Sequence, residues 1–287
     1  MAETAHRLQG IGDRLAFAGR RFHAWWEGYG FDAAAERARL LGERQTLAGP
    51  PEIAVPELIW GVGRTGPGDA AWTMRHARAL GLAARSSVFL FGAERGAALI
   101  ELKSAARWRA TGFARAPDDA ANVCSYDEAG AKLSRNGGDG ALAFFELYRD
   151  ADPSAFARFA AEFLKPGAPA AFVDFAIARR GGRLKACFPE QAPGSPRIAA
   201  DYQKALKDAG FSAADTVDET RIFLPLIARG WSRWKRAYDA ASGAPDGFQR
   251  AEALCFLRDY AAVWAERHDA LKSGCLQVVR IVGRKSG

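Results

Sequence analysis

The sequence predicts an α/β protein with a doubly wound, mostly parallel sheet, an N-terminal helical extension and a helical insertion before the last strand. Short apolar runs alternate along the chain with stretches of helical periodicity, which is the order expected of βαβ units. The run at 87–91 is short and apolar, as expected of a strand that is buried on both faces of a parallel sheet. At 287 residues, the chain is long enough for one large domain or two small ones.

Residues 1–68 are predicted to form a helical cover, or lid, for the rest of the chain. Apolar residues recur at helical spacing over 8–26, and a second helical stretch over 32–48 ends at the sequence GPP. Residues 52–69 are rich in glycine and proline, which predicts an irregular segment.

The predicted α/β domain covers 69–287. Strands are expected at 87–91, 108–113, 141–147, 170–177, 211–218 and 275–282. Helices are expected at 69–80, after the first strand, before the sequence LKPG at 164–167, and at 199–209, 221–240 and 247–272. The last two helices form the insertion, at about 221–272, that precedes the final strand.

The charge of the chain gives only weak support for a nucleic-acid partner. There are 40 basic and 33 acidic side chains, a net charge of +7, but they are interspersed rather than gathered in a basic block. Cations alternate with aromatic residues over 229–236, a pattern that suits single-stranded nucleic acid. However, Trp231, Trp234 and Tyr238 follow helical steps, so a core stripe with a basic outer face is the preferred interpretation.

Other protein classes are excluded more simply. No apolar run approaches the ~20 residues that span a bilayer. The first residues lack the apolar core of a secretory signal, so a cytoplasmic location is expected. The four cysteines and four histidines lack the spacing of zinc ligands, and His268 lies on an apolar helical stripe as a packing residue.

Several motifs occur in an order that resembles a known family. They are FLFGAERG at 89–96, TGFARAP at 111–117, SYD at 125–127, and LKPG at 164–167 leading to Val173 and Asp174. Over 71–285 the chain resembles a class I S-adenosylmethionine (SAM)-dependent methyltransferase, with Gly92, Glu94 and Gly96 in the place of the glycine-rich loop. The sequence WWEGY at 25–29 and the closing residues 274–285 also resemble a bacterial subgroup with an N-terminal helical cover.

The resemblance implies a SAM site whose key residues are largely substituted. Leu90 occupies the position of the acidic residue that the family has ahead of the loop, and Glu94 replaces the middle glycine. Ala114 replaces the carboxylate that would bind the ribose hydroxyls. A hydrogen bond to a charged group contributes about 1.5–3 kcal/mol, so the loss of two such groups costs roughly 10²–10⁴ in affinity. Arg95 and Arg115 would further repel a cationic cofactor.

Other acids offer an alternative. A register shift of one or two residues would let Glu101, Asp118 or Asp119 replace the lost carboxylate. Asp127 matches the family position at the adenine edge, although a loop Asp more often forms an Asx turn. Glu146, on the fourth predicted strand, and Asp174, on the fifth, lie at the carboxyl ends of the sheet, where sites gather in open α/β folds. Either could be a remnant of substrate chemistry, but a capping or surface role is preferred for both.

Three functional hypotheses follow. The first is a degenerate methyltransferase-fold protein without cofactor, a non-catalytic interaction or regulatory subunit that binds a protein partner or itself; Trp25, Trp26 and Trp60 would supply a lid or a dimer contact. The alternative is an active SAM-dependent methyltransferase on a small molecule with an atypical SAM site. A third hypothesis is an anionic ligand bound through Arg95 and Arg115.

Overall fold

The fold is described from a computed structural model of the whole chain. The described residues are Leu15, 17–22, Ala33, Leu47, 49–115, Asp118, 122–178, Leu184, Phe188, 194–212, 215–244 and 247–287. Two compact units are present: unit 1 comprises Met1–Gly61 and Ile227–Ala261, and unit 2 comprises Val62–Leu226 and Ala262–Gly287. The predicted cover at 1–68 and domain at 69–287 stay predictions.

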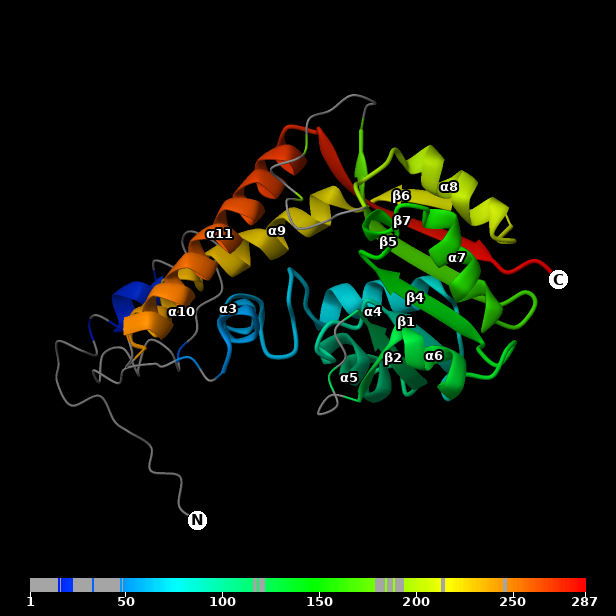
Figure 1. The fold of residues 1–287 in the computed structure, drawn as a ribbon, viewed down its shortest axis with the longest axis horizontal. Helices are drawn as coiled ribbons and strands as arrows, with labels where there is room; N and C mark the ends of the chain where they lie inside the picture. The colour runs from blue at the N-terminus through cyan, green and yellow to red at the C-terminus, as the bar shows by residue number, and fades with distance from the viewer. Residues whose placement is uncertain are drawn as a thin grey trace, which may run out of the picture. The chain divides into compact units, whose positions relative to one another are not determined.

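Unit 2 is built on a seven-stranded sheet in the order β3-β2-β1-β4-β5-β7-β6 (Figure 1). The strands are β1 (Ser87–Phe91), β2 (Arg109–Ala114), β3 (Val123–Ser125), β4 (Gly140–Phe144), β5 (Pro169–Ile177), β6 (Asp215–Asp218) and β7 (Leu276–Arg284). The first five are parallel, and β7 runs antiparallel between β5 and β6. The predicted doubly wound α/β sheet is therefore confirmed.

The order of the strands also defines where a ligand is expected. The chain builds β1, β2 and β3 outward in one direction, then returns to place β4 on the other side of β1. The carboxyl ends of β1 and β4 thus form the topological switch point, where open α/β sheets bind their ligands. Both strands are almost wholly buried, as their apolar sequences predict.

The helices that precede or connect the strands are α4 (Ala70–Ala79), α5 (Ala97–Ser104), α6 (Tyr126–Lys132), the short 3-10 helix η2 (Leu147–Arg149), α7 (Pro153–Glu162) and α8 (Ala199–Asp208). Of these, α4, α6 and α7 begin at side-chain caps. Asp69 accepts the Trp72 amide at 2.7 Å at the start of α4, and Ser125 and Glu128 form a capping box on α6. The fourth strand ends at Phe144, three residues before its predicted end, because η2 begins at Leu147.

The segment predicted as irregular at 52–69 instead begins with a helix, α3 (Pro51–Trp60). Pro51 lies in the first turn, where a missing N–H group removes no intrahelical bond. Val55, Ile59 and Trp60 are buried, so packing outweighs the helix-breaking tendency of Pro56. The chain becomes irregular only after Gly61.

The predicted helix at 221–240 is also wrong in part, because it is two helices. α9 (Thr220–Trp231) and α10 (Trp234–Ser242) are separated by a tight turn in which the Arg233 amide donates to the Gly230 carbonyl. The buried face of α10 consists of alanines, and Tyr238 is 52% exposed, so the expected aromatic core stripe is wrong. With α11 (Gly247–Lys272), these helices confirm the insertion before the last strand.

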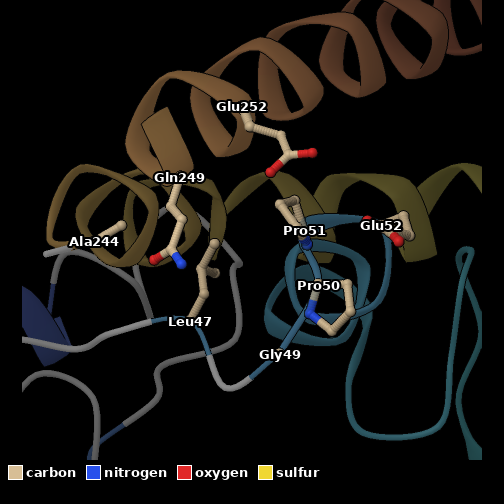
Figure 2. Close-up of a pocket in the computed structure, with 8 residues that line it drawn as sticks. All are labelled: Leu47, Gly49, Pro50, Pro51, Glu52, Ala244, Gln249 and Glu252. Carbon is tan, nitrogen blue, oxygen red and sulfur yellow. The ribbon is translucent and has the colours of Figure 1, made fainter. Parts of the chain in front are cut away.

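Within unit 1, α3 packs against α10. The Trp60 indole donates a 2.6 Å hydrogen bond to the Tyr260 hydroxyl, and a Cβ at Gly230 would lie 1.9 Å from the Trp60 ring. A cavity of about 400 Å³ near the start of α3 is lined by Leu47, Gly49, Pro50, Pro51, Glu52, Ala244, Gln249 and Glu252 (Figure 2). Trp25 and Trp26 of the predicted cover lie outside the described residues.

Candidate cofactor-binding site

The loop after β1 keeps the backbone of a glycine-rich turn. Gly92 has φ +69°, and a Cβ there would lie 2.1 Å from the Phe144 carbonyl oxygen, so the position requires glycine. Gly96 also has a positive φ, at 97°, and is the N-cap residue of α5. Glu94 adopts φ 50°, in the left-handed region that costs a side-chain-bearing residue about 1–2 kcal/mol. The turn is thus retained at the middle position although the glycine is not.

The Glu94 carboxylate is held by the segment that precedes α4. It accepts the Thr65 amide at 3.0 Å, and Gly66 lies directly beside it, since a Cβ there would be 3.4 Å from Oε1. Burial raises the pKa of Glu94, while the Thr65 amide and the Arg64 charge oppose that effect. The Glu94 carboxylate is therefore turned toward the segment that precedes α4.

The positions of the two missing acids are apolar and closed. Leu90 is fully buried in β1, and Ala114 is 5% exposed at the end of β2. Of the alternative acids, Glu101, on α5, forms an ion pair with Arg64 at 2.5 Å. Asp119 lies outside the described residues. Asp118 does lie near the glycine-rich loop, where its carboxylate pairs with Arg95 at 3.1 Å.

A hydrogen-bonded group of side chains links the strand ends around this loop. The Gly92 amide donates to the Tyr126 hydroxyl at 3.0 Å, and Tyr126 shares a side-chain hydrogen bond with Glu146. Arg115 donates from Nε to Glu146 Oε2 at 3.0 Å. Residues that follow β1, β2, β3 and β4 are thus joined in one network.

The sequence favoured a capping or surface role for Glu146, and both are wrong: the residue is 4% exposed, and its side chain caps none of the described helices. Burial raises its pKa, although the charges of Arg149 and Arg115 lower it. The pKa of Tyr126 lies well above its usual value, first because of burial and second because of the Glu146 charge. Tyr126 is the middle residue of the SYD motif at 125–127, but the sequence singled out only Asp127 from that motif as a candidate site residue.

The remaining predicted site residues have structural roles. Asp174 is 1% exposed and accepts the amides of Leu147 and Phe175 at 2.7 and 2.8 Å, which confirms its predicted capping role. Asp127 is exposed in the first turn of α6 rather than in a loop, so the Asx-turn interpretation is wrong. A carboxylate in that position interacts favourably with the helix dipole.

Two arginines that were proposed for an anionic ligand are already paired. Arg95 contacts Asp118, and Arg115 contacts Glu146 and, at 3.9 Å, Asp150. Each guanidinium is therefore neutralised by the protein itself, which weakens that third hypothesis. A different arginine, Arg149 on η2, lies within electrostatic reach of Glu94, Glu146 and Asp174.

Two kinds of feature are absent from the described residues. No group of three or more potential ligands is arranged to hold a metal ion in that part of the chain. None of the helices described above is long and apolar enough to cross a membrane. His268 is partly exposed beside Asp269, whereas the buried polar residue on that face of α11 is Arg267.

The fold resembles several solved structures. Phosphoethanolamine N-methyltransferase 2 from Haemonchus contortus matches with a TM-score of 0.64 and 12% identity, over 82% of this chain and 57% of that protein. The cyclopropane synthase MmaA2 from Mycobacterium tuberculosis gives 0.60 and 11%, over 75% and 83% of the two chains. The cyclase SpnF gives 0.59 and 14%, over 85% and 99%. No family model and no curated protein matches the sequence.

The chain therefore has the Rossmann-like class I methyltransferase fold. At 11–14% identity this likeness concerns the fold alone. One of the three structures is named a cyclase, so the same fold hosts more than one chemistry. The chain spans only 57% of the length of the Haemonchus enzyme, so the function must be argued from the site itself.

Proposed function

We propose that the protein is a SAM-dependent methyltransferase that acts on a small molecule and binds SAM through a rebuilt acidic site. The observation that carries the proposal is a cluster of three carboxylates, Glu94, Glu146 and Asp174. Glu94 and Glu146 follow the carboxyl ends of β1 and β4, and Asp174 lies within β5, beside the end of β4. This is the switch point where the fold binds ligands.

The charge of this cluster complements SAM. The three carboxylates lie with two guanidinium groups, Arg115 and Arg149, which leaves one negative charge in excess when all five are ionised. SAM carries an ammonium, a sulfonium and a carboxylate, which leaves one positive charge in excess. A buried carboxylate regains a charged partner when such a cation binds, which favours its ionised form.

The rebuilt site would use different residues from those of the usual site. Glu94 or Glu146 would meet the cationic part of the cofactor, in place of an acid at Leu90, and Asp118 is the described acid nearest in sequence to the end of β2. The bound cofactor would supply an electrophilic methyl group, and the residues of this chain would orient it and exclude water. The Haemonchus structure, which contains S-adenosylhomocysteine, supports the choice of SAM over the expectation that no cofactor binds.

A second candidate function is a non-catalytic subunit that binds a protein partner or itself in the cytoplasm. It is favoured by the closed, apolar environment of Leu90 and Ala114, and by the contacts of Tyr126 and Arg115 with Gly92 and Glu146. These contacts would have to rearrange if a nucleoside were to occupy the same space. In this function no cofactor is needed.

Calorimetric titration with SAM and S-adenosylhomocysteine separates the two functions. Micromolar binding that weakens in Glu146→Gln supports the methyltransferase. Glu162→Gln is the matched control, because Glu162 is 52% exposed and pairs only loosely, at 3.7 Å, with Arg135. If neither compound binds at millimolar concentration, the methyltransferase is excluded and a search for partner proteins follows.

A further inference from the structure

We propose that Arg149 binds a carboxylate or phosphate group of the molecule that accepts the methyl group. This inference rests on the proposed function, and it names the class of acceptor. Arg149 lies on η2, which follows closely after β4 at the switch point of the sheet. A methyl acceptor must reach this edge to meet the cofactor.

The Arg149 side chain is fixed by its own neighbours. Its Nε donates to the Phe145 carbonyl at 3.0 Å, and its guanidinium carbon lies 5.5 Å from the centre of the Tyr148 ring. Phe145 adopts φ 56°, a left-handed conformation that is rare for a bulky residue and occurs preferentially at functional sites. A strained backbone carbonyl thus anchors one edge of the guanidinium.

The backbone of η2 is held from the other side as well. A Cβ at Gly194 would lie 2.3 Å from the Tyr148 carbonyl oxygen and 2.3 Å from the Arg149 carbonyl carbon, so this glycine packs directly on the backbone of η2. Arg197 donates from Nη2 to the Ala151 carbonyl just beyond. The position of Arg149 is therefore set by packing, as expected of a residue that binds a ligand in a defined geometry.

The terminal nitrogens of Arg149 remain available, although three carboxylates lie within electrostatic reach. Glu94 accepts the Thr65 amide, Glu146 accepts Arg115, and Asp174 accepts the amides of Leu147 and Phe175. None of the carboxylates in the described ranges forms an ion pair with Arg149. Within that part of the chain, the only hydrogen bond of the Arg149 side chain is the one from Nε to the Phe145 carbonyl.

This arrangement fits a bidentate anion. A guanidinium presents two parallel N–H groups that match a carboxylate or a phosphate, and a half-buried fork loses little entropy on binding. Burial lowers the pKa of Arg149, but Tyr148, Glu146, Asp174 and Glu94 raise it overall, so the group stays cationic. Arg95 and Arg115 cannot serve equally, because each is already paired.

The test uses inorganic phosphate and acetate as probes, added separately to the full-length protein saturated with S-adenosylhomocysteine. The NMR signal of the Arg149 Nε–H group reports binding directly. Both probes should shift this signal in a saturable way while S-adenosylhomocysteine stays bound. If neither anion shifts it, the inference is wrong.

Variants then assign the binding to Arg149. Arg149→Leu should weaken the binding of both anions at least about tenfold, and Arg149→Lys should retain part of it, because a point charge replaces the fork. Arg158→Leu is the matched control, since Arg158 is 52% exposed on α7 and pairs with Asp152. Equal binding in Arg149→Leu and wild type would overturn the inference, and the wild-type spectrum alone decides if that variant does not fold.

A separate arm identifies which ligand supplies the anion. S-adenosylhomocysteine has a carboxylate, whereas 5′-methylthioadenosine lacks it. If Arg149→Lys weakens only S-adenosylhomocysteine, or if phosphate displaces it, Arg149 binds the cofactor and the inference is wrong. If S-adenosylhomocysteine does not bind at all, the proposed function fails, and the anion titration of the free protein still tests whether Arg149 binds an anion.

Discussion

The Gly92 amide donates a 3.0 Å hydrogen bond to the hydroxyl of Tyr126, and so the end of β1 is tied to the start of α6, which follows β3. The two strands are not neighbours, because β2 lies between them. The hydroxyl also contacts Glu146 after β4. One phenol therefore organises three strand ends of the candidate site.

Replacement of this phenol should lower the stability of the folded protein. Tyr126→Phe keeps the ring contact with Phe91 but leaves the Gly92 amide without its acceptor, which costs about 1–3 kcal/mol for a buried group. Urea unfolding measures the change. Tyr238→Phe, at a position that is 52% exposed, should change stability by less than about 0.5 kcal/mol. Equal losses of stability in the two variants would mean that the hydrogen bond to the Tyr126 hydroxyl does not stabilise the fold.

Two effects explain why Gly92 must be glycine: the strain of a positive φ and the collision of a Cβ with the Phe144 carbonyl oxygen. Gly81→Ala, at φ +63° with open space around it, should cost only the strain of a left-handed alanine, about 1–2 kcal/mol. Gly92→Ala, at a similar φ, should cost clearly more, because its Cβ would lie 2.1 Å from the Phe144 oxygen. Thermal and urea unfolding give both values. Similar losses for the two variants would argue against the close approach of β1 and β4.

Restoring the acid at the end of β2 tests the register of the site. Ala114→Asp should strengthen SAM binding by about tenfold or more, because a hydrogen bond to a charged group contributes about 1.5–3 kcal/mol. It should also lower stability without ligand, since the position is 5% exposed. Ala114→Asn has nearly the same shape without the charge and should gain less affinity. Calorimetry measures both; if Asp weakens binding, Ala114 does not face the ribose.

The buried imidazole of His76 gives the protein a distinct dependence on pH. Burial lowers its pKa to about 3, with the charges of Arg280 and Arg75 acting in the same direction. The unfolded chain binds a proton below its ordinary pKa of 6.5, whereas the folded protein does not until about pH 3. Stability should therefore fall as the pH falls through this window, by up to about 1.4 kcal/mol per pH unit.

His76→Phe isolates this contribution. Phenylalanine preserves the ring contacts with Trp72 and Phe144 but does not titrate. The variant should gain stability relative to wild type as the pH is lowered from 6.5, as measured by urea unfolding at several pH values. A difference that stays constant with pH would show that His76 does not carry the effect. His268→Gln, at a partly exposed position, serves as the control.

The sequence predicts the sheet better than the site, for a physical reason. Strands such as 87–91 and 170–177 are marked by local apolar runs, and the structure places their ends within a residue of the predicted ones. The turn at Gly92 and Gly96 is likewise encoded by the residues that form it. By contrast, α3 was missed because its buried apolar residues outweigh the two prolines, which only tertiary packing reveals.

The residues that fill the site depend on topology, which local patterns do not contain. Tyr126 meets Glu146 because β3 and β4 end at the same edge, with β2 and β1 between them. Arg149 was missed for the same reason, since its neighbours Glu94 and Asp174 come from the loop after β1 and from β5. Substitutions at Leu90 and Ala114 could be recognised only through the resemblance to a family, and they describe what is missing rather than what replaces it.

The role of Glu94 distinguishes the two candidate functions most directly. Glu94→Gly removes both the carboxylate and the left-handed strain at φ 50°. If Glu94 helps to bind the cation, as we propose, SAM affinity should fall by about tenfold or more, although the backbone becomes that of the family's usual loop. If Glu94 merely blocks the loop, affinity should rise instead. Calorimetry with SAM at neutral pH gives the sign.

The pH dependence of the same titration supplies the internal control. Burial raises the pKa of Glu94 and Glu146, so protonation at lower pH removes the charges that attract SAM. Wild-type affinity should therefore decrease as the pH falls through these raised pKa values, and the decrease should be smaller in Glu94→Gly, which has lost one of the two groups. Affinity that does not change with pH in either protein would contradict a rebuilt acidic site, whatever the strength of binding.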